Sequence, residues 1–90
     1  ILRGPESFGG LLEARGVPAV PAPRWPSPEL DEPFFSGGYS TLRHGSAEGG
    51  TIDGIQIEHH WPGIRDSAAS RAAYAEELAE VIRTWLDRWY

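Results

Sequence analysis

The stretch that decides the fold is SAASRAAYAEELAEVIRTWLDRWY, residues 67–90. Its apolar side chains recur every three or four residues, which is the period of an amphipathic helix: Tyr74, Leu78, Val81, Ile82, Trp85, Leu86 and Trp89. Asp66 or Ser67 is placed to cap the first turn. The sequence therefore predicts a helix from about residue 67 to 89, with Trp85 and Leu86 buried against a sheet.

An alternative for this helix is a position along a membrane surface. Such helices carry a polar face rich in Lys and Arg, whereas residues 67–90 hold three Arg against four acidic residues. No apolar run in the chain approaches the roughly 18 residues of a membrane span. Packing in a protein core is the favoured interpretation, and no membrane partner is expected.

The segment before this helix predicts a strand. Residues 52–58 read Ile-Asp-Gly-Ile-Gln-Ile-Glu, and alternation turns Ile55 and Ile57 to one face and Gln56 and Glu58 to the other. A glycine pair precedes the segment and a Pro-Gly pair follows it. A strand followed by a long amphipathic helix indicates the α/β class.

Residues 5–16 predict a short helix, with Ser7 near its start and Gly16 as its C-terminal stop. Gly9 and Gly10 weaken this helix by about 1 kcal/mol each relative to alanine. Their lack of a side chain instead suits close packing against a neighbouring element.

Residues 17–33 contain six prolines, which exclude a helix and a central strand. The segment predicts an extended, polyproline-like arm docked on a surface, because Trp25 and the Phe34-Phe35 pair are unusual in a free linker. A flexible linker is the alternative.

We divide the chain into two parts of one larger domain. Residues 1–33 comprise the short helix and the arm, and residues 34–90 comprise the glycine-rich segment, the strand and the C-terminal helix.

Composition narrows the class of protein. The 90 residues hold eight Arg, no Lys and 13 acidic residues, a net charge of −5, which argues against a nucleic-acid partner. The absence of cysteine excludes disulfides, thiolate zinc sites and thiol nucleophiles. The chain also lacks methionine and begins at Ile1, so we expect a processed chain completed by an N-terminal chain or segment of the same protein, as in a heterodimer. The sequence is compatible with a cytoplasmic chain and with one that is secreted after processing.

Two places in the chain suggest chemistry. Glu58 ends the predicted strand, where carboxylates of α/β folds face the ligand crevice, and one there can act as a general acid/base; a solvated surface is the alternative. His44 precedes a glycine that permits close backbone approach, although a lone histidine in a loop is more often a structural or exposed residue. His59 and His60 point to opposite sides of an extended chain, so we assign no metal ligand here.

Taken in order, a set of short motifs resembles the C-terminal part of the N-formylglutamate amidohydrolase family: Phe35-Ser-Gly-Gly-Tyr39, Arg43-His-Gly-Ser46, Gly49-Gly50, Gln56-Ile-Glu58 and Gly63-Ile-Arg65-Asp66. The resemblance covers roughly residues 34–90. It implies the C-terminal portion of a zinc carboxypeptidase-like fold, a mixed sheet flanked by helices. It also implies hydrolysis of a small amide or peptide, with zinc held by ligands in an N-terminal part that lies outside this sequence.

The resemblance and the residue chemistry together assign roles to six residues. Glu58 is the expected general acid/base, taking a proton from water and passing it to the leaving nitrogen. Arg43 is expected to hold a substrate carboxylate through two hydrogen bonds, and His44 to donate to the oxyanion. The further substrate-binding residues are Tyr39, Gln56 and Arg65.

One departure from the family pattern bears on the substrate. The His59-His60 pair follows Glu58, at a place where N-formylglutamate amidohydrolases are not expected to carry two histidines. This indicates a divergent branch of the family that acts on another amide or peptide.

The alternative to an amidohydrolase is a non-catalytic interaction module or structural subunit on the same scaffold. Such a module would use the proline-rich arm and the aromatic residues to bind protein.

Overall fold

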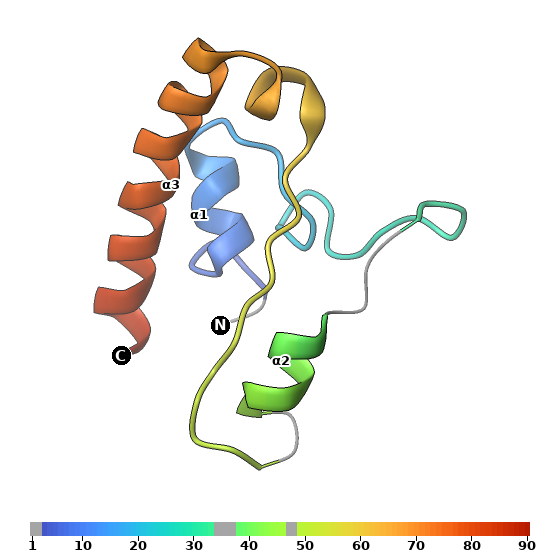
Figure 1. Ribbon diagram of the computed structural model, residues 1–90, viewed down its shortest axis with the longest axis vertical. Coiled ribbons are helices and arrows are strands. Elements are labelled where there is room, and N and C mark those ends of the chain that lie inside the picture. The colour runs from blue at the N-terminus through green and yellow to red at the C-terminus, as the bar shows by residue number, and fades with distance from the viewer. Residues whose placement is uncertain (1–2, 34–37, 47–48) are drawn as a thin grey trace.

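The computed structural model describes residues 3–33, 38–46 and 49–90. Within these ranges the order of elements is α1 (Phe8–Ala14), α2 (Tyr39–His44), the irregular turn η2 (Trp61–Arg65) and α3 (Ala68–Trp89) (Figure 1). No strand occurs in the described residues. The predicted α/β class with a mixed sheet is therefore wrong, and the described part of the chain is a small, all-helical fragment.

Helix α3 confirms the strongest prediction from the sequence. Ser67 caps it from extended backbone (φ −144°, ψ 164°), and its hydroxyl oxygen accepts a hydrogen bond from the Ser70 N–H at 3.0 Å. Asp66 precedes the capping residue Ser67, and its carboxylate accepts a hydrogen bond from the Gly63 N–H at 2.8 Å. That hydrogen bond lowers the pKa of Asp66.

Helix α1 forms where a helix was predicted but is shorter than residues 5–16. The Ser7 hydroxyl accepts from the Gly10 N–H at 3.1 Å and donates to the Gly4 carbonyl at 2.8 Å. The chain leaves the helix through Gly16, whose φ of +80° lies in the left-handed region that favours glycine. Both ends of the helix are therefore fixed by local sequence.

The core lies between α1 and α3, which run in opposite directions (Figure 1). Phe8 meets Trp85 edge to face, with the ring centroids 5.9 Å apart and the planes at 79°. The Trp89 indole N–H donates to the Glu6 carbonyl at 3.1 Å. The buried apolar side chains of the described residues are few: Leu12, Ala22, Val81 and Trp85.

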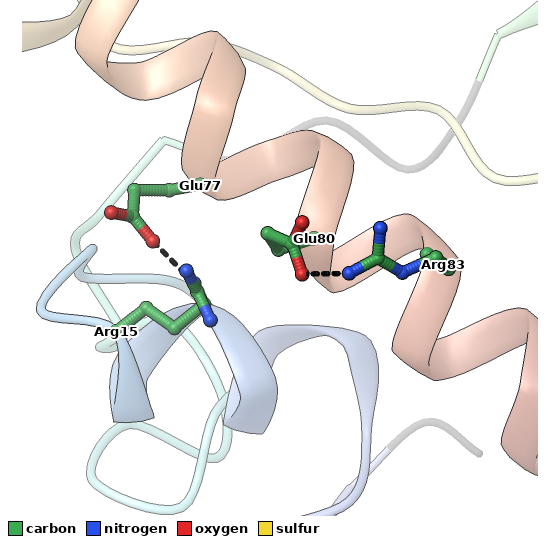
Figure 2. A network of polar contacts seen from close by, with 4 residues as sticks. All are labelled: Arg15, Glu77, Glu80 and Arg83. Carbon is green, nitrogen blue, oxygen red and sulfur yellow. Dashed lines mark hydrogen bonds and ion pairs between the residues drawn. The ribbon is translucent and has the colours of Figure 1, made fainter.

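Ion pairs add to this contact at its exposed edge. Arg15, the C-cap residue of α1, pairs with Glu77 of α3, while Arg83 pairs with Glu80 of its own helix (Figure 2). All four side chains are more than a third exposed, so both pairs stabilise the structure only weakly, and only the Arg15–Glu77 pair links the two helices.

The arm crosses α1 at Gly9. A Cβ at Gly9 would collide with the backbone carbonyl of Pro21, so the predicted close approach at this glycine is confirmed. Ala22 is only 2% exposed, and its N–H donates to the Trp25 carbonyl at 2.8 Å. Residues 21–25 thus lie on α1, whereas the large side chain of Leu30 further along the arm is fully in water.

Two expectations that depended on a sheet are wrong. Residues 52–58 are extended but unpaired, because the described chain offers no second strand to complete their backbone hydrogen bonds, and Ile52 and Ile55 are exposed. Trp85 is buried as predicted, but against α1. Leu86, which was also expected to be buried, remains 46% exposed.

Candidate functional site

Helix α2 carries three of the predicted site residues. The Thr41 hydroxyl accepts from the Gly38 N–H at 3.1 Å and donates to the Gly38 carbonyl at 2.9 Å, which fixes the start of the helix. Tyr39 begins it and is largely exposed, while Arg43 and His44 form its last turn. Phe34–Gly37, which belong to the motif before α2, lie outside the described residues.

The extended segment after residue 49 runs back along α2 (Figure 1). Gly54 packs against Thr41 and Gly45, close enough that an added Cβ would sit 3.7 Å from their Cα atoms. At the start of α2, the Oε1 atom of Gln56 lies against the Gly38 backbone, in the space that a Cβ at Gly38 would occupy. The Gly-Gly-Tyr and Gln-Ile-Glu motifs therefore meet in space.

Glu58 is joined to this contact through Gln56. The Gln56 side-chain amide donates to a carboxylate oxygen of Glu58 at 2.7 Å. The two side chains lie on the same side of the extended segment, as their spacing of two residues predicts. Both are exposed, so the carboxylate is open to a ligand or to a further part of the protein.

Arg43 and His44 line a separate, open hollow at the other end of α2. It has a volume of about 570 Å³, and its remaining walls come from the apolar Leu42 and Ile52 together with Gly45, Gly50 and Thr51. Glu58 does not line this hollow. The predicted site is thus divided between the two ends of one short helix: Tyr39, Gln56 and Glu58 at its start, and Arg43 and His44 at its end.

Arg65 is placed elsewhere, in η2. Its guanidinium lies 5.5 Å from the centroid of the Trp61 ring. Its carbonyl accepts from the Arg71 guanidinium at 2.8 Å, which joins η2 to the first turns of α3. The structure does not bring Arg65 to either end of α2, and its contacts are those of a residue that anchors a turn.

The two adjacent histidines contact different partners. The His59 ring packs edge to face on Tyr74 of α3, with centroids 5.3 Å apart. The Nδ1 atom of His60 lies 3.2 Å from the Pro62 carbonyl oxygen. Among residues 3–33, 38–46 and 49–90, no group of three His, Cys, Asp or Glu side chains is arranged to hold a metal ion.

Sequence reasoning missed a polar contact centred on Asp53. Its carboxylate accepts from the Ser46 hydroxyl at 2.5 Å and from the Tyr90 hydroxyl, which joins the end of α3 to the loop after α2. These hydrogen bonds, that of Ser46 first, lower the pKa of Asp53, while the bond to Asp53 raises the pKa of Tyr90. No spacing in the sequence pairs residues this far apart.

Comparisons with known proteins add no relative. No protein-family model, no curated protein and no solved structure matches the chain. In the part of the chain that the structure describes, no helix is both long and apolar enough to cross a membrane.

Proposed function

We propose that this chain is the C-terminal part of a zinc-dependent amidohydrolase that cleaves an N-formyl or N-acyl amino acid or a similar amide, with Glu58 as general acid/base. The observation that carries the proposal is the contact of Gln56 with Gly38, continued by its hydrogen bond to Glu58. It joins two of the motifs on which the resemblance to N-formylglutamate amidohydrolases depends.

The chemistry assigned to Glu58 is proton transfer. As the oxygen of water bonds to the amide carbonyl carbon, the carboxylate takes the proton that water loses. It then gives this proton to the nitrogen when the C–N bond breaks, which leaves an acid and a free amine. The Gln56 amide supports this role because its hydrogen bond fixes one carboxylate oxygen and leaves the other free.

Arg43 and His44 are proposed to bind the substrate. A guanidinium matches a carboxylate through two parallel hydrogen bonds, and a protonated or neutral imidazole can donate to a developing oxyanion. Arg43 and His44 are the fifth and sixth residues after Gly38, where Gln56 makes its contact, so they lie about 8–9 Å along the helix from it, at 1.5 Å of rise per residue. That span suits a short, extended substrate whose carboxylate is remote from the amide. Tyr39 lies at the start of α2, the end of the helix where Gln56 and Glu58 are found.

Zinc is proposed to be bound outside these residues. The described side chains do not offer a set of ligands, so no step above depends on a metal held by this chain. We therefore propose that the ligands belong to an N-terminal chain or segment of the same protein. The described residues bury four apolar side chains, a very small core, and this supports the need for such a partner.

The direct test is to isolate the protein together with whatever it binds, measure its zinc content, and assay it against N-formyl and N-acyl amino acids that carry a free carboxylate. One zinc per complex and release of the free amino acid are expected. A stable assembly without zinc and without amidase activity against this series would contradict the proposal.

A non-catalytic interaction module is the second candidate, and one observation favours it. Among the residues that the structure describes, exposed large apolar side chains outnumber buried ones, and they include Trp25, Leu30, Trp61, Ile82 and Leu86. In that case a stable complex is expected that contains no zinc and keeps its affinity when Glu58 is replaced by Gln. Loss of complex formation in Trp25→Ala or Leu30→Ala would support a role of the arm in binding.

A further inference from the structure

A second apolar stripe runs along α3 beside the one that α1 covers. From residue 68 onward, alternating steps of four and three residues meet only apolar side chains, and all of them are exposed. We call these seven residues the free seam: Ala68, Ala72, Ala75, Ala79, Ile82, Leu86 and Trp89. Steps of three and four residues form a heptad repeat, whose apolar positions face another helix in coiled-coil packing.

The surface area of the chain leaves room for such a contact. Its accessible surface is 6955 Å², whereas a folded monomer of 9.9 kDa exposes about 5,200 Å². The difference of about 1,750 Å², summed over the whole chain, exceeds the roughly 800 Å² that each partner buries in an ordinary protein interface. Helix α3 stands at one edge of the molecule, with α1 and the arm on one side of it (Figure 1).

The free seam is complementary to itself. Its four alanines occupy the N-terminal half and its three large side chains the C-terminal half. When two copies lie antiparallel, each large residue faces an alanine of the second copy: Ile82 faces Ala79, Leu86 faces Ala75 and Trp89 faces Ala72. Large side chains over alanines allow close approach without voids. A parallel pair would instead crowd the large residues together and leave a gap between the alanines.

The charges beside the free seam agree with the same arrangement. Glu76 and Arg83 flank it on the side away from α1, and both are exposed. In the antiparallel pair each Glu76 lies beside Arg83 of the second copy, and symmetry repeats this contact. Arg83 now pairs with Glu80 of its own helix at the surface, a weak contact that leaves it able to reach a second acid (Figure 2).

From these observations we propose that two copies of this chain pair through the free seam, with their α3 helices antiparallel. The pairing buries the parts of Ile82, Leu86 and Trp89 that stay exposed in a single copy, which are 40%, 46% and 38% of these residues. It uses none of the residues to which we assign chemistry, so it does not rest on the amidohydrolase proposal and is tested separately from it.

Sedimentation equilibrium of the full chain tests the pairing. A dimer is expected at about 100 µM. Ala75→Leu should raise the dimer dissociation constant by about 100-fold, because the added side chain occupies the space of Leu86 of the second copy in both halves. Position 75 is exposed and leucine is a good helix former, so the monomer keeps its helix content by circular dichroism. Ala73→Leu, exposed but outside the seam, is the matched control and should leave the dimer intact.

Charge and orientation give two further readouts. Glu76→Arg should weaken the dimer by placing like charges together, and adding Arg83→Glu to it should restore pairing. Because the chain has no cysteine, Ala69→Cys accepts a single spin label, and the two labels should lie about 35 Å apart along an antiparallel pair but side by side in a parallel one. A monomer at this concentration, a dimer indifferent to Ala75→Leu, or adjacent labels would overturn the proposal.

Discussion

The Gln56 amide donates a hydrogen bond of 2.7 Å to the Glu58 carboxylate, while the other end of the same amide rests on the Gly38 backbone. A single side chain thus connects the carboxylate to the start of α2. The orientation of Glu58 therefore depends on a glycine that is distant in the sequence.

Gly38→Ala tests this dependence. The backbone at Gly38 is extended (φ −119°), so alanine is tolerated there, but its Cβ would displace Oε1 of Gln56. We expect an activity loss of about tenfold in the assembled protein, with the free energy of unfolding changed by within about 0.5 kcal/mol. Gln56→Ala should have a similar effect on activity, and the double variant should be no worse than either single one. Additive losses would mean that the two residues act independently.

Trp85 and Leu86 are neighbours on α3 but differ in burial, so replacing them should change the free energy of unfolding by different amounts. Trp85→Ala should lower the free energy of unfolding by about 3–5 kcal/mol, because the indole fills the contact with α1. Leu86→Ala should cost about 1 kcal/mol, since half of this side chain is already in water. Both values refer to denaturation at concentrations where the chain is monomeric. Equal effects would mean that α1 covers a different face of α3.

The amphipathic pattern predicted α3 and its Ser67 cap, because period and capping are local properties of the sequence. It did not predict which part of a wide apolar arc is covered: Val81 and Trp85 are buried, Trp85 against Phe8 of α1, and Leu86 is 46% exposed. The alternation in residues 52–58 predicted a strand, but a strand also needs a neighbour, and that requirement is not local. The contacts of Gln56 with Gly38 and of Tyr90 with Asp53 were not predicted for the same reason, because they depend on the path of the whole chain in space.

The Asp53–Tyr90 contact predicts a dependence on pH. The pKa of Asp53 is lower than its ordinary 3.8 when folded, so the stability it contributes is present above that value and is lost as the pH falls through the folded pKa. The pKa of Tyr90 is raised, so its contribution is present below about pH 10 and is lost as the pH rises further.

Titration of the Tyr90 ring by NMR measures this coupling. Asp53→Asn removes the carboxylate that opposes ionisation of the phenol, and we expect the pKa of Tyr90 to return toward its ordinary value. The pKa of Tyr74 is raised by burial alone, so it serves as an internal control and should not move. If the pKa of Tyr90 is the same in the Asp53→Asn protein, the two side chains are not in contact.

The turnover of the Glu58→Gln protein, assembled with its partner and zinc, tests the proposed function most directly. Glutamine keeps the shape and the contact with Gln56 but cannot take a proton, so kcat should fall by about 10²–10⁴-fold while KM changes little. Glu29→Gln, the same exchange on the exposed arm, should leave kcat unchanged. Full turnover in the Glu58→Gln protein would contradict the assignment of Glu58 as the general acid/base.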